Sequence, residues 1–219
     1  MIIVVVALVT VGVATTLYRS KMHPASSQAS ATATTAATAA EEKEDETLHV
    51  RGPRTAPVTI EVYGDFQCPS CGIFSAALGG LEKQYEGQVR VIFHEFPLAM
   101  HNHAMEAAMA AEAAGRQGRF WEMHDMLYRY QSVWSKVSDV SRFFAAYAES
   151  LGLDLGRFQL DAKSPDLQAR IISEGDAGVA RGVKNTPTIF INGREVQNAF
   201  KPEILEQTID AALADKKKS

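Results

Sequence analysis

The chain has 219 residues, which is enough for one domain of moderate size together with shorter flanking segments. Hydrophobic residues make up 46% of the chain, so a substantial core can form. The formal net charge is −4 and provides no basic field, which argues against nucleic acid as a partner.

The N-terminal segment, residues 1–21, is expected to direct the chain to a membrane. Residues 2–17 are almost wholly apolar, slightly short of the roughly 20 residues that a spanning helix needs. We interpret the run as a signal anchor or as the apolar region of a signal peptide. Arg19 and Lys21 follow it, and the positive-inside rule would hold them in the cytoplasm, although long domains translocate largely regardless of such charges. Both forms, a retained anchor and a cleaved peptide, stay open.

Residues 22–46 are expected to form a flexible linker. Positions 22–40 are rich in Ala, Ser and Thr and lack large apolar side chains, so they cannot bury enough surface to fold alone. The acidic run at 41–46, EEKEDE, is interpreted as a solvated continuation of this linker. The folded domain is then predicted over residues 47–216.

The first part of this domain is predicted to be a strand–helix–strand unit. A short strand is expected over 47–50, and an apolar run predicts a strand over 58–63. A helix is predicted over 69–85, followed by a strand over 89–96. Because such a unit has a right-handed crossover, its two longer strands are expected to pair in parallel.

The middle of the domain, about residues 101–163, is predicted to be a helical insertion. Alanines at helical spacing from Ala104 to Ala114 indicate its first helix. Later helices are expected to begin near Phe120 and to lie over 140–151 and 154–162.

After the insertion, the sequence indicates a return to the α/β frame. A helix is predicted over 165–182, and Asn192-Gly193 is a strong hairpin signal. This turn is expected to join a strand over 188–191 to a short strand near 195–197. A last helix is predicted over 201–214.

The only two cysteines, Cys68 and Cys71, lie at the first strand-to-helix junction. A disulfide closing so short a loop would stabilise the fold little, so the pair is better explained by its reactivity. Cys68 is expected at the helix N-terminus, where free N–H groups and the macrodipole favour negative charge. In such a position a thiol pKa can fall from about 8.5 to roughly 3.5–7.5. Cys71 lies one turn deeper and is expected to be less exposed, so the spacing predicts dithiol–disulfide chemistry.

Four segments, taken in order, resemble the thioredoxin superfamily and, within it, the DsbA-like thiol–disulfide oxidoreductases. They are DFQCPSC at 65–71, FPL at 96–98, GRFWEMHD at 118–125 and TPT at 186–188. The resemblance covers residues 47–214. It implies an α/β thioredoxin-like fold with an inserted helical domain.

The resemblance also implies roles for residues around the cysteines. The dipeptide Pro69 and Ser70 would tune the redox potential of the pair, and Pro69 costs the first helical turn no hydrogen bond. Pro187 would be cis and would pack beside Cys68. The backbone of Thr186 would then be free to pair with an extended substrate.

The chain departs from the family at one position. Many relatives carry a buried glutamate six residues before the nucleophilic cysteine, which assists proton transfer, but here that residue is Val62. The nearby carboxylates, Glu61 and Asp65, are candidate modulators. Because adjacent side chains of a strand point to opposite faces, Glu61 is expected to face away unless a bulge intervenes. Asp65 precedes a turn, where an Asp is commonly a backbone acceptor.

The predicted function is the introduction of disulfides into secreted or envelope proteins. The Cys68–Cys71 disulfide is the expected redox group, with no further cofactor and no metal, because a structural zinc site needs four N or S ligands. Reduced or unfolded proteins are expected as substrates and a membrane re-oxidase as partner, with the domain in the periplasm or otherwise outside the cytoplasm. A reductase or isomerase of the same fold, or a non-catalytic peptide-binding chaperone, are the alternatives.

Overall fold

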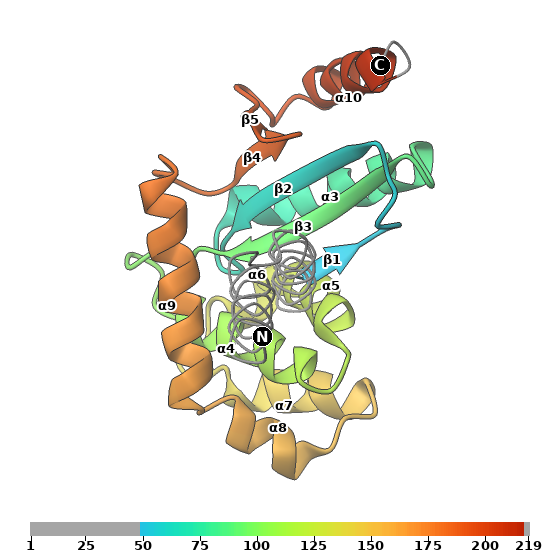
Figure 1. Cartoon of the computed structure of the whole chain (residues 1–219). Helices are drawn as coiled ribbons and strands as arrows, with labels where there is room; N and C mark the ends of the chain where they lie inside the picture. Colours follow the sequence, from blue (N-terminus) through green and yellow to red (C-terminus); the bar gives the residue numbers. More distant parts are fainter. Residues whose placement is uncertain (1–48, 217–219) are drawn as a thin grey trace, which may run out of the picture. The chain divides into compact units, whose positions relative to one another are not determined.

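A five-stranded sheet lies at the centre of the part of the chain that this computed structural model describes, residues 49–216 (Figure 1). The strand order is β1-β3-β2-β4-β5. The strands are β1 (His49–Arg51), β2 (Val58–Gly64), β3 (Val89–Glu95), β4 (Thr188–Ile191) and β5 (Arg194–Glu195). β2 and β3 pair in parallel, as predicted, and the other neighbouring strands pair antiparallel. The α/β thioredoxin-like fold class is therefore confirmed.

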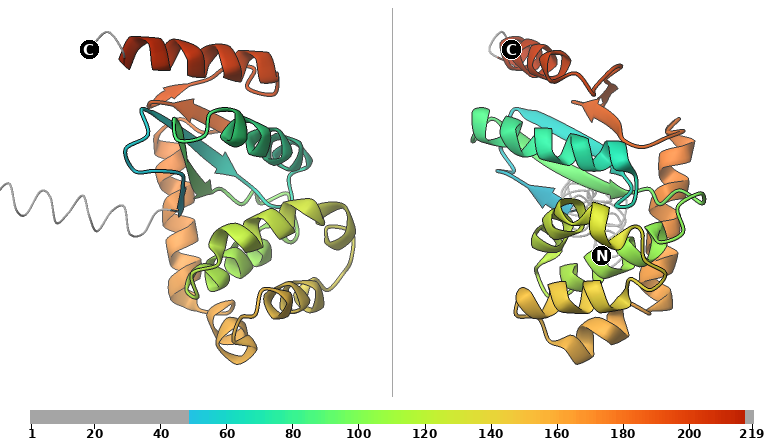
Figure 2. Two further views of the ribbon diagram at one scale, coloured as in Figure 1. Left: turned by 90° about the vertical axis from the view of Figure 1, so that its right-hand side faces the viewer. Right: turned by 180° about the vertical axis from the view of Figure 1, so that it is seen from behind.

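Helices cover the sheet and form the predicted insertion. They are α3 (Pro69–Gln84), α4 (Ala104–Gly115), α5 (Phe120–Arg129), α6 (Gln131–Trp134), α7 (Ser141–Ser150), α8 (Leu155–Asp161), α9 (Pro165–Ala180) and α10 (Pro202–Lys216). Figure 2 shows the insertion, α4 to α8, gathered at one end of the sheet. The long helix α9 leads from it back to the sheet.

The two faces of the sheet bury different sets of side chains. Along β2, Ile60 and Val62 point to the face that packs against α3 and α10. Tyr63 points to the other face, where it contacts Phe96 and Phe190 in a smaller cluster. Since successive side chains of a strand alternate between faces, this one strand supplies both cores.

Helix α4 is the buried centre of the insertion. It packs against α5, α7, α8 and α9, and all of its alanines are buried. A helix that is apolar all round belongs in a core, and alanine lets its neighbours approach closely. The indole of Trp134 is also fully buried, and its Nε1 donates to the Leu127 carbonyl at 2.8 Å.

Several element boundaries differ from the predicted ones. The helical insertion was expected from about residue 101, but its first helix begins at Ala104, because 101–103 form a turn in which His103 N donates to the Gln67 side chain at 2.6 Å. The short strand expected near 195–197 is Arg194–Glu195. Within residues 49–216, no helix is long and apolar enough to span a membrane. The anchor expected at 1–21 and the linker expected at 22–46 lie outside the described residues.

The predicted hairpin between β4 and β5 is present. Both turn residues have positive φ, 46° for Asn192 and 77° for Gly193, which suits Asn and Gly better than any other pair. The Asn192 side chain also accepts a hydrogen bond from Thr59 N at 2.8 Å, so the turn is fixed to β2.

Two glycines of α9 provide a test of the packing between this helix and the sheet. A Cβ atom at Gly178 would lie 2.8 Å from the Tyr63 ring and 3.0 Å from the Phe96 ring. We expect Gly178→Ala to lower the free energy of unfolding by about 1–3 kcal/mol, because overpacking outweighs the better helix propensity of alanine. Gly175→Ala is the matched control. It meets nothing within 4 Å and should stabilise the protein by up to about 1 kcal/mol. Urea denaturation measures both, and equal effects would contradict this packing.

Candidate active site

The two cysteines lie where α3 begins. Cys68 is the N-cap residue, with extended φ and ψ of −69° and 120°. Its carbonyl accepts hydrogen bonds from Cys71 N at 3.1 Å and Gly72 N at 3.2 Å. The first turn of the helix contains no acidic residue. The positive end of the helix dipole is therefore not neutralised beside the Cys68 sulfur.

The surroundings of Cys68 favour its thiolate. Its pKa is lowered to about 4 because the Cys71 side chain donates a hydrogen bond to the sulfur, with further contributions from Ser70 and Thr186, and together these outweigh burial. The Ser70 hydroxyl lies 3.1 Å from the Cys68 Sγ. Cys68 is thus placed to react as a nucleophile at neutral pH.

Cys71 has the opposite character. Burial raises its pKa, and the neighbouring Cys68 sulfur raises it further, so that Cys71 stays a thiol when Cys68 is ionised. It is only 2% exposed, and its side chain lies on the same buried face of α3 as Phe74 and Leu78. Two adjacent thiols with pKa values driven apart suit separate roles, Cys68 as the nucleophile and Cys71 as its protonated partner.

The loop before β4 completes the site, as the resemblance implied. The Thr186–Pro187 peptide bond is cis, and the Cys68 thiol lies 3.4 Å from the Thr186 carbonyl oxygen. The Thr186 hydroxyl is buried and has no hydrogen-bond partner within residues 49–216. Its proton is therefore available to a thiolate sulfur, and it favours the charged form of Cys68 and of Cys71.

The two candidate modulators lie in different places. Asp65 is buried just before the cysteine turn, where it accepts hydrogen bonds from Gln67 N at 2.7 Å and Leu98 N at 2.9 Å. Its second oxygen is also 2.7 Å from His101 Nδ1. Asp65 is thus a backbone acceptor that shapes the turn, as its position before a turn suggested.

Glu61 points to the face of the sheet opposite the cysteines. The β2–β3 ladder is continuous, so no bulge re-aims the side chain. Glu61 accepts a hydrogen bond from Arg181 at 2.9 Å, and its other oxygen lies 3.6 Å from His94. The pKa of Glu61 is lowered to about 2, because these two partners outweigh the effect of burial. The alternation argument predicted this orientation.

Two glutamines, which were not predicted, join the cysteine turn to the helical insertion. Gln131 of α6 donates from Nε2 to the Phe66 carbonyl at 2.7 Å and to the Cys68 carbonyl at 2.9 Å. Gln67 Nε2 donates to the Ser135 carbonyl at 3.3 Å. No local sequence pattern marks Gln131, because its partners lie more than 60 positions away in the chain.

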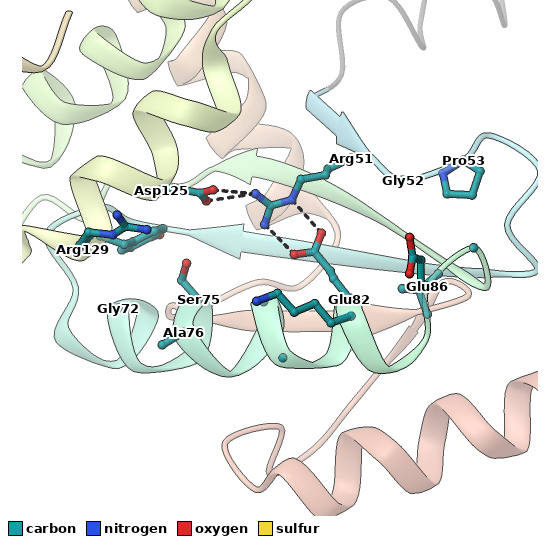
Figure 3. Close-up of a pocket in the computed structure, with 16 residues that line it drawn as sticks. Arg51, Gly52, Pro53, Gly72, Ser75, Ala76, Glu82, Glu86, Asp125 and Arg129 are labelled. Carbon is teal, nitrogen blue, oxygen red and sulfur yellow. Dashed lines mark hydrogen bonds and ion pairs between the residues drawn. The ribbon is translucent and has the colours of Figure 1, made fainter. Parts of the chain in front are cut away.

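A groove lies to one side of the sulfur atoms. It has a volume of about 1180 Å³ and runs along the small side chains of α3 (Figure 3). Arg51 forms one wall, where its guanidinium donates to Glu82 at 2.7 Å and to Asp125 at 3.0 Å. Neither cysteine lines the groove. Across residues 49–216, no three His, Cys, Asp or Glu side chains are arranged to hold a metal ion.

The Thr186 hydroxyl provides a test of how the Cys68 thiolate is stabilised. We expect Thr186→Val, which keeps the shape of the side chain but removes its proton donor, to raise the pKa of Cys68 by about one unit. The ultraviolet absorbance of the thiolate, titrated in the reduced protein, measures the change. Thr188→Val is the matched control, because the Thr188 hydroxyl donates to the Asn185 carbonyl at 2.8 Å and not to a sulfur. Equal shifts in both variants would contradict the role of the Thr186 hydroxyl.

Comparison with known proteins gives a family match over most of the chain. The family model described as thioredoxin matches residues 43–211. The Na(+)/H(+) antiporter NhaA 3 of Salinispora tropica is 42% identical over 167 residues, which are 76% of this chain and 25% of that protein. NhaA 1 of Salinispora arenicola is 41% identical over the same shares. The chain thus spans about a quarter of the length of the curated relatives that it matches.

Solved structures with the same fold include proteins of the DsbA type. α-DsbA1 of Wolbachia pipientis has a TM-score of 0.69 at 18% identity, over 77% of this chain and 92% of that one. BdbD of Bacillus subtilis has a TM-score of 0.67 at 22% identity, over 75% and 92%. MdbA of Corynebacterium diphtheriae, a thiol-disulfide oxidoreductase, has a TM-score of 0.59 at 22% identity, over 76% and 90%. The fold that the DsbA-like resemblance implied is confirmed, and the two cysteines lie together at the start of α3, as that resemblance implied.

Proposed function

The chain belongs to the thioredoxin family, and we propose that it introduces disulfides into other proteins by exchange through Cys68 and Cys71. One observation carries the proposal: the Cys68 sulfur lies at the start of α3, 3.1 Å from the Ser70 hydroxyl, and Cys71, Ser70 and Thr186 lower its pKa. A sulfur stabilised as a thiolate favours the reduced form of the pair, so the oxidised form passes its disulfide on readily.

The reaction begins with the oxidised Cys68–Cys71 pair. A substrate thiolate attacks the Cys68 sulfur, a substrate–Cys68 disulfide forms, and the electron pair of the broken bond goes to Cys71. A second substrate thiolate then attacks the substrate sulfur of this mixed disulfide. The products are an oxidised substrate and the reduced pair, with Cys68 released as the stabilised thiolate.

Reduced or unfolded proteins are the proposed substrates. Ile73, two residues beyond Cys71, is 74% exposed although it is apolar. An exposed apolar side chain in the helix that begins at the cysteines would contact apolar segments that a folded protein buries. Burial of both sulfurs also means that a substrate must present an extended, accessible cysteine.

The proposed location is the cell envelope, outside the cytoplasm, with a membrane re-oxidase as partner. Disulfides persist in oxidising compartments, so an oxidase of proteins is useful there. The apolar run at 2–17 supports association with a membrane. The match to one quarter of the length of relatives named as Na(+)/H(+) antiporters supports it too, because antiporters are membrane proteins.

The redox potential of the pair separates this proposal from its alternatives. Equilibration with glutathione should give a redox potential of roughly −120 mV. A potential near the roughly −270 mV of thioredoxin would instead indicate a reductase. Cys68→Ser should lose all oxidation of a reduced, unfolded protein. A variant that kept full activity would refute the enzymatic function and would favour a peptide-binding chaperone.

The thiolate should also make the stability of the reduced protein depend on pH. The pKa of Cys68 is about 4 in the folded protein and 9.0 ordinarily, so between these values the unfolded chain binds more protons. Stability therefore rises with pH across this window and is lost as the pH falls through the folded value. We expect the reduced wild type to have a higher free energy of unfolding than reduced Cys68→Ser, and we expect this difference, measured by urea unfolding, to shrink as the pH is lowered towards about 4. A difference that is independent of pH would contradict a stabilised thiolate.

A further inference from the structure

Arg181, the C-cap residue of α9, joins the end of that helix to the sheet. Both terminal nitrogens of its guanidinium donate to the Glu61 carboxylate of β2, Nη1 to Oε2 and Nη2 to Oε1, the latter at 2.9 Å. Such a parallel pair of charge-assisted bonds fixes the direction of the guanidinium as well as its position. His94 of β3 also holds Glu61, with its Nε2 3.6 Å from the carboxylate. The C-terminal end of α9 is therefore fixed to the middle of the sheet.

The same guanidinium also contacts β4. Its Cζ lies 3.9 Å from the centroid of the Phe190 ring, so the cation stacks on that aromatic face. Its Nη1 lies 3.4 Å from the hydroxyl of Tyr63, a residue of β2. One side chain at the end of α9 thus contacts two neighbouring strands of the sheet.

The chain between Arg181 and β4 is the loop that carries Thr186 and Pro187 (Figure 1). α9 stops directly after Arg181, because Gly182 has a φ of 100° and the next residue, Val183, bonds from its N back to α9 at 3.0 Å. β4 then begins directly after Pro187. So short a loop cannot move far while both of its ends are fixed, and Arg181 contacts the element on either side of it.

This loop supplies part of the environment of Cys68. The Cys68 thiol lies 3.4 Å from the Thr186 carbonyl oxygen, and the Thr186 side chain is among the groups that lower the pKa of Cys68. Because a hydrogen bond depends on distance and angle, even a small displacement of the loop would change this environment. Arg181 can therefore influence the sulfur without touching it.

We propose that Arg181 and Glu61 are positioning residues, whose ion pair holds the loop of Thr186 and Pro187 against the Cys68 sulfur. The inference rests on the proposed disulfide exchange and adds to it two residues from the face of the sheet opposite the cysteines. It also gives Glu61, which the sequence suggested as a modulator, an indirect route to the site.

Titration of the thiolate absorbance in the reduced full-length protein tests the proposal. Arg181→Gln and Glu61→Gln each break the ion pair, and each should raise the pKa of Cys68 by about half a unit, because the loop can then move Thr186 away from the sulfur. The equilibrium with glutathione should shift by about threefold towards the oxidised pair, since a half-unit rise in pKa destabilises the thiolate by that factor.

The signs of the two shifts separate positioning from a direct effect of charge. By Coulomb's law alone, loss of the Arg181 cation would raise the pKa of Cys68, whereas loss of the Glu61 anion would lower it. Positioning predicts a rise in both variants. It also predicts that the double variant shows the rise of one single variant and not their sum, because either substitution already breaks the pair.

Arg116→Gln is the matched control. Arg116 is the C-cap residue of α4 and, like Arg181, forms an ion pair with a carboxylate, that of Asp161 at 2.6 Å in the helical insertion. Its substitution should leave the pKa of Cys68 and the equilibrium with glutathione unchanged. Urea unfolding of each variant shows that the protein being titrated is folded.

The outcomes separate the two proposals. Opposite shifts in Arg181→Gln and Glu61→Gln, or shifts no larger than that of Arg116→Gln, would overturn the role of the ion pair and leave the proposed function standing. A wild type that oxidises no reduced protein would instead refute the proposed function. The titration would still decide the role of the ion pair, because it needs no substrate.

Discussion

The hydrogen bonds that converge on the Cys68 sulfur are the interaction on which the rest of the site depends. The Ser70 hydroxyl comes from the first turn of α3, but the Thr186 carbonyl, to which the Cys68 thiol donates, comes from a loop 118 positions away. The β2–β4 register brings them together, because Tyr63 pairs with Thr188 and the two chain segments leave the sheet at the same edge. The start of α3 alone would provide only the contacts from its own first turn, and the sheet adds the contact from the loop before β4.

The helical insertion contributes to the same site through its backbone contacts. Gln131 bonds to the carbonyls on either side of Gln67, and Gln67 in turn reaches the backbone of Ser135 and His103. The cysteine turn is therefore held from the sheet by Asp65 and from the insertion by two glutamines. Because side chains locked by packing and outer hydrogen bonds hold reactive groups in place, the insertion makes the orientation of Cys68 less dependent on the turn itself.

The sequence was informative where a local pattern decides the structure. The strand–helix–strand order predicted the parallel pairing, alternation predicted the orientation of Glu61, and Asn192-Gly193 predicted the hairpin. Gln131 could not be predicted, since its role arises from contacts between distant segments. Glu95, which is buried at the end of β3, did leave a signal, because it continues the inward positions of its strand after Phe93 as a charged residue among apolar ones. At such a position the pattern predicts burial, whereas an acid is ordinarily exposed.

Glu61 and Glu95 show how the environment gives two carboxyl groups of adjacent strands opposite properties. Glu61 has Arg181 and His94 as partners, so it is ionised and contributes to stability at neutral pH. Glu95 has no such partner and is neutral, so its contribution to stability declines as pH rises through its raised pKa. The Cys68 thiolate has the opposite dependence on pH. An acid that keeps its proton and a thiol that releases its own therefore lie on the same side of one sheet, and in each case the surroundings of the group, not its chemical type, decide its ionisation.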